Sequence, residues 1–161
     1  MTRHQPIALS PSATVGEVDF GPLTGLAGFM LRLAQLHLFE SFFHDFGARG
    51  ITPGQIGILV AIGRNPGIRQ GVLADALHIK WSNMAKIVRL FEDQGLVERR
   101  VPQSDRRAVE LHLTKKGGGT VDETVPLLTV SDRAATDALT ARERDTLLRL
   151  LAKLARPEGV S

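Results

Sequence analysis

The chain has 161 residues, of which 43% are hydrophobic, and its formal net charge is +3. This size and composition predict one folded domain with a sizeable core, or a small domain with helical extensions. Cysteine is absent, which excludes disulfides, thiolate catalysis and zinc–thiolate sites and fits a cytoplasmic location.

The N-terminal part of the chain predicts an arm followed by a long helix. Residues 1–20 mix Pro, Ser, Thr and Gly without periodicity, which is typical of a flexible arm. From Leu23 to Phe46 the pattern is helical and apolar, but its longest uncharged stretch, residues 20–31, is too short to span a membrane. No signal-peptide pattern opens the chain, so we expect neither membrane insertion nor secretion.

Three further helices are expected before residue 96. Thr52 and Gln55 form a capping box around Pro53, which predicts a helix that ends before Asn65-Pro66-Gly67. The segment RQGVLADALHI predicts a short helix whose apolar face holds Val72, Leu73, Ala76 and Leu77. The segment WSNMAKIVRLFEDQG predicts a helix that Gly95 ends. Its apolar face holds Met84, Ile87, Val88 and Phe91, and its polar face holds Ser82, Asn83, Lys86 and Arg89.

The C-terminal part predicts two strands and two helices. LVERRV and AVELHLT alternate apolar and polar residues, as antiparallel strands do, and PQSDRR joins them. Thr114 can cap a helix that runs towards the 130s, although residues 117–119 are all glycine and Pro126 should kink it. A capping box at Thr140 and Glu143 opens a final helix with five leucines between Leu147 and Leu154.

Positive charge is concentrated in the middle of the chain. From Arg64 to Lys116 there are 11 Lys and Arg residues against 6 Asp and Glu, whereas the remainder is slightly acidic. A basic middle suggests a polyanionic partner, because neutralising phosphates releases counterions and drives association. The alternative is a solvated basic face without a partner.

The order of these elements predicts a winged helix-turn-helix. Two short helices joined by a tight turn precede a two-stranded wing, and in this geometry the second helix enters the DNA major groove. Asn83 can read adenine there, and Lys86 or Arg89 can read guanine, while the charged wing turn meets phosphate. Each of these side chains alone is compatible with ordinary solvation, but their joint placement favours DNA.

The run LADALHIKWSNMAKIVRLFEDQGLVERRVPQSDRRAVELHLTKKG resembles the DNA-binding core of MarR-type transcriptional regulators. Its most specific part is the wing pattern DRRAVELHLTKKG, and the likeness in element order covers residues 22–156. The resemblance implies a mainly α fold with a small β wing, in which dimerisation helices frame a winged helix-turn-helix core. It implies a flexible arm over 1–20, dimerisation regions over 21–50 and 115–161, and a DNA-binding lobe over 51–114.

The resemblance also implies a mode of action. Such proteins are homodimers that bind a pseudo-palindromic operator in double-stranded DNA, usually as repressors, and release it on binding a small molecule. Aromatic acids, phenolics or their thioesters are the effector classes that the resemblance suggests, but no residue identifies the effector. The same residues leave open a winged-helix module for protein contacts instead.

The DNA-contacting residues are inferred from the pattern and the resemblance together. The resemblance implies that Arg107 enters the minor groove and that Asp105 orients it. Arg69 and Lys80 stand where relatives carry helix caps, so DNA phosphate or water would satisfy those amide ends. Trp81 occupies a first-turn position often filled by a small residue or proline, where it either packs or contacts DNA. The full expected set is Arg69, Gln70, Lys80, Ser82, Asn83, Lys86, Arg89, Asp105, Arg106 and Arg107.

A stripe on the first helix suggests an effector site. Its apolar beginning is continued by three polar groups, His37, Ser41 and His44. Either this stripe is exposed, or it lines a cavity beside the DNA-binding lobe that holds a small ligand. The effector position implied by the resemblance favours the second interpretation.

Other chemistry has little support in the sequence. The glycines at 117–119 lie beside two lysines, but the GxxxxGK[ST] phosphate loop is missing, and the five histidines show no HExxH or comparable metal-ligand pair. A small hydrolase would need Ser41 beside His37 or His44, without a nucleophile elbow or oxyanion hole. We therefore expect no enzyme activity, no metal and no cofactor.

Overall fold

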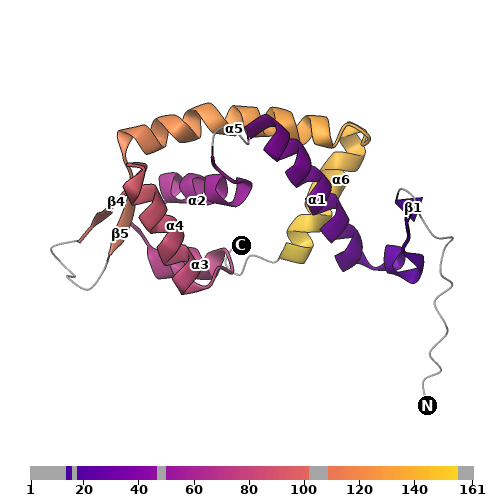
Figure 1. The fold of residues 1–161 in the computed structure, drawn as a ribbon, viewed down its shortest axis with the longest axis horizontal. Coiled ribbons are helices and arrows are strands. Elements are labelled where there is room, and N and C mark those ends of the chain that lie inside the picture. Colours follow the sequence, from indigo (N-terminus) through magenta and orange to yellow (C-terminus); the bar gives the residue numbers. More distant parts are fainter. Residues whose placement is uncertain (1–13, 16–17, 47–49, 102–108, 156–161) are drawn as a thin grey trace, which may run out of the picture. The chain divides into compact units, whose positions relative to one another are not determined.

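The computed structural model describes residues 14–15, 18–46, 50–101 and 109–155 (Figure 1). By its internal contacts the chain divides into two compact units, Met1–Glu40 and Ser41–Ser161. The first unit holds a two-stranded antiparallel ladder, β1 (Thr14–Val15) with β2 (Val18–Asp19), then the 3-10 helix η1 (Gly21–Gly25). Helix α1 (Ala27–Phe46) begins in this unit.

The N-terminal helix begins later than the sequence pattern predicts. Leu23 belongs to η1, and Leu26 adopts an extended conformation with φ −99° and ψ 118° that separates η1 from α1. Pro22 lies at the start of η1, where its fixed φ is compatible with a helical turn. The predicted start at Leu23 was therefore wrong by four residues.

The second unit is mainly helical and contains one small sheet. Its helices are α2 (Pro53–Arg64), α3 (Gln70–Ala76), α4 (Trp81–Asp93), α5 (Lys115–Ala135) and α6 (Ala141–Ala155). The strands β3 (Ile68–Arg69), β4 (Val97–Arg100) and β5 (Glu110–Leu113) form an antiparallel sheet in the order β3-β5-β4. Helix α2 lies alongside the long helix α5, and α3 and α4 lie on the other side of α2 (Figure 1).

The wing has one more strand than the sequence predicts. Val97 pairs with Leu113 and Arg100 with Glu110, as expected for the two long strands. In addition, Ile68 pairs with Leu111 and Arg69 with Glu110, which places a strand just before α3. A two-residue strand is too short for an alternating pattern, so only the tertiary pairing reveals it.

The main core lies between α2, α3, α4 and the sheet. Helix α4 buries three residues of its predicted apolar face, Met84, Val88 and Phe91, while Ile87 packs partly buried against them. The other buried members are Ile58, Leu59, Ile62, Leu73, Ala74, Leu96, Val97 and Leu111. A second cluster joins Phe42 and Ile56 to α5. The main core thus packs α3 and α4 against the sheet, and the second cluster packs α2 against α5.

The predicted apolar face of α3 was partly wrong. Leu73 is buried, but Val72 is 57% exposed and Leu77 is 40% exposed. The helix has only seven residues and meets the core through Gln70, Leu73 and Ala74, which follow the i, i+3, i+4 spacing of one helical face.

Both predicted caps of the C-terminal helices are present. The Thr114 hydroxyl accepts a hydrogen bond from the Gly117 amide at 3.0 Å, and α5 continues through Pro126. At the start of α6, the Glu143 carboxylate accepts hydrogen bonds from the hydroxyl and the amide of Thr140, and these bonds lower the pKa of Glu143. Helix α6 has no buried residue, and the Arg144–Asp132 ion pair joins it to α5.

Candidate nucleic-acid interface

The turn between α3 and α4 is set by backbone hydrogen bonds. The Ile79 amide donates to the Ala74 carbonyl at 2.9 Å and the His78 amide donates to the Asp75 carbonyl at 3.1 Å, which is a Schellman motif. His78 holds the left-handed position with φ 50°, where glycine is commonest. Because this turn is compact and its Ile79 packs on the core, α4 has a fixed direction relative to α3.

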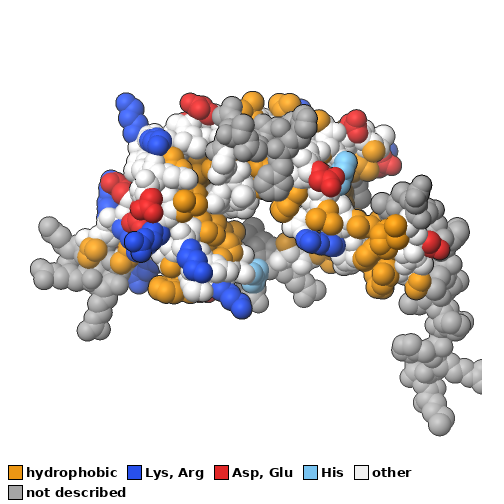
Figure 2. Space-filling view, viewed as in Figure 1, with side chains coloured by type: hydrophobic (Ala, Val, Ile, Leu, Met, Phe, Trp, Pro, Cys, Tyr) orange, Lys and Arg blue, Asp and Glu red, His pale blue; other side chains and the backbone are white. Residues whose placement is uncertain are grey.

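Helix α4 presents the predicted polar face to the outside. Ser82, Asn83, Lys86 and Arg89 are all exposed, and Lys80 before them is exposed as well. Neither α3 nor α4 has a side-chain cap, since Arg69 and Lys80 occupy their N-cap positions without a capping bond. Figure 2 shows Lys and Arg side chains gathered over the part of the molecule that holds α3, α4 and the strands β4 and β5.

Two of the four wing arginines are paired within the chain. Arg99 Nε lies 3.1 Å from the Glu92 carboxylate at the end of α4, and Arg100 pairs with Glu98 on its own strand. Their positive charge is thus partly balanced before any partner binds. Asp105, Arg106 and Arg107 lie outside the described residues.

One described residue of the expected DNA-contacting set is buried, and Trp81, which lies beside that set, is exposed. Gln70 is only 9% exposed, because it occupies the core-facing side of α3. Trp81 is 66% exposed, so the structure does not support packing in the core for this side chain. The remaining described residues, Arg69, Lys80, Ser82, Asn83, Lys86 and Arg89, all lie at the surface.

Two of the three expected effector residues can be placed in the structure. His37 is exposed on α1 and Ser41 is half-buried. The side chain of His44 lies outside the described residues. Neither of two cavities in the described part of the second unit has a lining residue from α1.

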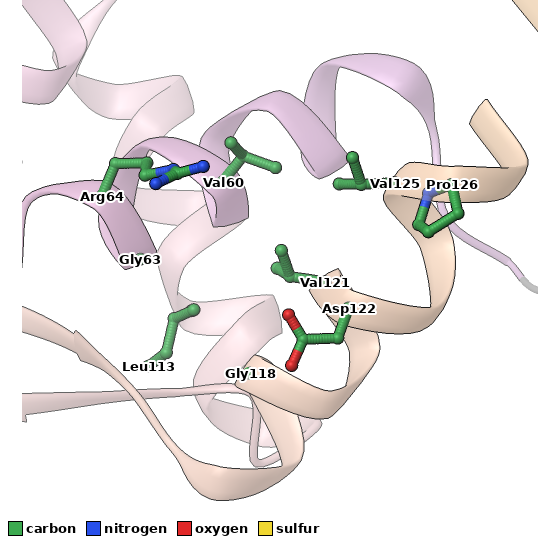
Figure 3. A pocket seen from close by; sticks show the side chains of 9 residues that line it. All are labelled: Val60, Gly63, Arg64, Leu113, Gly118, Val121, Asp122, Val125 and Pro126. Carbon is green, nitrogen blue, oxygen red and sulfur yellow. The ribbon is translucent and has the colours of Figure 1, made fainter. Parts of the chain in front are cut away.

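The larger of these cavities lies between α2, β5 and the first half of α5, and its volume is about 550 Å³ (Figure 3). Apolar side chains form most of the wall, while Arg64 from α2 and Asp122 from α5 are its charged members. The absence of side chains at Gly63 and Gly118 leaves this space open. The complete lining is Val60, Gly63, Arg64, Leu113, Gly118, Val121, Asp122, Val125 and Pro126.

Sequence reasoning missed this cavity. Its walls come from three segments that are up to 66 positions apart along the chain, from Val60 to Pro126. No local pattern links them, because the apolar residues of the lining follow the ordinary helical spacing of α2 and α5. The glycine run at 117–119 was the nearest signal, and it pointed only to a weak helix start.

Comparisons with known proteins agree with this geometry. The model of the MarR family matches residues 49–108. A putative transcriptional regulatory protein for the hcr operon of Thauera aromatica is 32% identical over 149 residues, which are 92% of this chain and 90% of that protein.

Solved structures with this fold include two of a single repressor. The transcriptional repressor CouR bound to a 23-mer DNA duplex superposes with a TM-score of 0.79 at 35% identity, over 87% of this chain and 99% of that one. CouR bound to p-coumaroyl-CoA gives 0.77 at 33% identity, with the same coverage. In the described part of this chain, no helix is long and apolar enough to cross a membrane. This chain belongs to the MarR family of transcriptional regulators.

Proposed function

We propose that this protein is a dimeric repressor that binds operator DNA and releases it when a small molecule binds. The observation that carries the proposal is the two-sided character of α4. One face of this helix buries Met84, Val88 and Phe91, and the opposite face exposes Asn83 and Lys86. A helix so anchored can enter a major groove without unfolding any part of the core. A regulator of this kind acts on chromosomal DNA and therefore in the cytoplasm.

Within this proposal, side chains of α4 contact the DNA bases, while the helix starts and the wing contact the DNA backbone. Asn83 donates and accepts at adenine, and Lys86 or Arg89 donates to guanine. The starts of α3 and α4, where the N-cap residues Arg69 and Lys80 make no side-chain capping bond, suit phosphate oxygens, because a helix N-terminus attracts anions. Arg106 and Arg107, with Asp105, are proposed to contact the minor groove or backbone from the wing tip.

A second copy of the chain is the proposed partner of α6. This helix has no buried residue, yet Leu148, Leu150 and Leu154 are each about half exposed or more. On α5, Leu127 and Val130 are exposed as well. Large apolar side chains gathered on two consecutive helices mark an association surface. A two-fold dimer would place two α4 helices at half-sites about one DNA turn apart.

Binding of DNA can be tested with alanine variants in a mobility-shift assay. We expect Lys86→Ala and Arg89→Ala to weaken binding to a selected operator by about 1–3 kcal/mol where a base contact is lost, or to lower the salt slope by about 1 where a phosphate contact is lost. Arg142→Ala, an exposed arginine on α6, is the matched control. A protein-interaction module, the alternative function, would show no salt-dependent binding to any duplex.

The cavity between α2 and α5 is the site that we propose for the effector. CouR was solved with p-coumaroyl-CoA, a thioester of a phenolic acid, so this molecule and its free acid are suitable probes. Apolar walls suit the aromatic ring, and Arg64 can pair with a carboxylate or phosphate. The stripe of His37, Ser41 and His44 remains a second candidate site. A ligand at either place must bind the DNA-incompetent dimer more tightly, since equal affinity shifts nothing.

One substitution separates these two sites. A Cβ at Gly118 meets no atom within 4 Å, so Gly118→Leu should fill the cavity without disturbing the fold. Gly119→Leu is the matched control, because Gly119 is also unobstructed but does not line the cavity. We expect Gly118→Leu alone to abolish ligand-induced release of DNA. Loss of release in His37→Ala and His44→Ala, with Gly118→Leu unaffected, would assign the effector to the stripe on α1 instead.

A further inference from the structure

Trp81 is the first residue of α4, and it is unusually exposed for so large an apolar side chain. Its exposed fraction is 66%, and within the described residues its indole N–H has no hydrogen-bond partner. Buried or bound tryptophans normally place the ring on apolar groups and satisfy the N–H. Here neither occurs in the free chain, so the residue contributes little to the stability of the fold.

Its position on α4 explains why the core does not cover it. At about 100° per residue Trp81 points within about 20° of the direction of Val88, which is fully buried. The two residues are, however, almost two turns apart, and helical side chains lean towards the N-terminus. The ring of Trp81 therefore extends past the last turn that packs on the core. It projects from the N-terminal end of α4. This is the end that recognition helices place against base edges in the major groove.

The neighbours of Trp81 identify what the ring can meet. Lys80, Ser82 and Asn83 surround it in sequence at the uncapped start of α4, and all are exposed. Polar and cationic groups of this kind suit phosphate and base edges, whereas an indole face needs an apolar surface. The one apolar group that a base pair offers in the major groove is the C5 methyl of thymine.

We propose that Trp81 is a specificity-determining residue that packs its indole face against a thymine methyl in each operator half-site. This inference rests on the proposed DNA-binding function and adds a hydrophobic reading to the hydrogen bonds assigned to Asn83, Lys86 and Arg89. Burying one methyl group contributes about 0.8 kcal/mol, which corresponds to a factor of about four in affinity per half-site.

The intrinsic fluorescence of the protein reports on this residue directly. Trp81 is the single tryptophan, and the chain has no tyrosine. In the free protein its emission should be quenched readily by iodide. Addition of operator DNA should protect it from iodide, whereas equally strong quenching in the complex would show that the ring stays in solvent and would overturn the proposal.

The decisive experiment replaces thymine by uracil, which removes only the methyl group. A duplex is first selected from a random library with the full-length protein, and each thymine of the half-site is then exchanged in turn. At one position we expect about fourfold weaker binding per half-site for the wild type and for Trp81→Phe, which keeps an aromatic face. Trp81→Ala should bind the parent duplex more weakly and should be insensitive to that exchange.

The outcomes separate this inference from the function beneath it. If no duplex is enriched, the DNA-binding function fails and the role of Trp81 falls with it. If a duplex binds with salt dependence but uracil changes nothing, or if Trp81→Ala keeps the full sensitivity to uracil, only the role of Trp81 is overturned. Because Trp81 is mostly exposed, its variants should melt like the wild type, and a melting curve for each checks this.

Discussion

At the scale of single residues, three consecutive glycines at the start of α5 have different roles. A Cβ at Gly117 would lie 2.0 Å from the Leu96 carbonyl oxygen, a backbone atom that cannot move away. Gly118 lines the cavity, and Gly119 is exposed with nothing within 4 Å. Gly117 therefore permits the close approach of α5 to the start of β4, while Gly119 only lowers helix propensity.

This difference gives a test within one tripeptide. Gly117→Ala should destabilise the protein by about 3 kcal/mol, since the methyl group must displace backbone. Gly119→Ala should instead stabilise it by up to about 1 kcal/mol, through the better helix propensity of alanine. Urea denaturation of both variants measures these shifts in the free energy of unfolding. Equal effects would mean that α5 does not approach Leu96 as closely as the structure shows.

At the scale of elements, the turn between α3 and α4 depends on His78. A β-branched residue tolerates the left-handed conformation poorly, whereas glycine adopts it freely. His78→Val should therefore be less stable than His78→Gly by about 1–2 kcal/mol in thermal denaturation. Because the turn directs α4, His78→Val should also bind operator DNA more weakly. Equal stability of the two variants would indicate that the turn relaxes to another conformation at little cost.

Hydrogen bonds join the start of α5 to the end of α4 and to the segment before β4. The Thr114 hydroxyl accepts a hydrogen bond from the Gly117 amide and donates one to the Gly95 carbonyl at 2.7 Å. The Lys116 ammonium donates to the Gln94 carbonyl at 2.7 Å. These bonds connect the end of α4, the start of β4 and the start of α5 at one place. We propose that these bonds are the route by which a ligand in the cavity beside α5 would shift α4.

At the scale of the whole molecule, the exposed leucines of α6 predict dependence on a second chain. Leu148 and Leu154 are 50% and 65% exposed, so replacing both by glutamate should leave the folded monomer intact. In a dimer interface the same carboxylates would be buried without partners, at a cost of several kcal/mol. We expect the double variant to have the mass of one chain, 17.5 kDa, and to lose operator binding.

Analytical ultracentrifugation at micromolar concentration measures this mass, with Arg149→Glu on the same helix as the control. A dimeric double variant would place the interface elsewhere. A monomeric double variant that keeps full affinity for the operator would show that one α4 helix is sufficient for binding.

The sequence by itself determined the features that depend on neighbouring residues. Capping boxes at Thr52 and Thr140, the Thr114 cap and the Gly95 stop were predicted because the groups that make each bond lie within a few positions of one another. The two faces of α4 were predicted for a related reason, since Met84, Val88 and Phe91 repeat at the helical period. From these features and the wing pattern, the winged-helix fold and the family followed.

Only the tertiary structure decided the features that depend on distant segments. Strand β3 exists because Ile68 pairs with Leu111, 43 positions away, and the cavity exists because residues of α2, β5 and α5 line one space. The tertiary structure also decided that Gln70, expected at the DNA surface, is buried, and that Trp81, for which packing and DNA contact were both open, is 66% exposed. The sequence period gives the direction in which a side chain points from its helix. Whether that side chain is buried depends on which other element packs there, and this is decided by the tertiary structure.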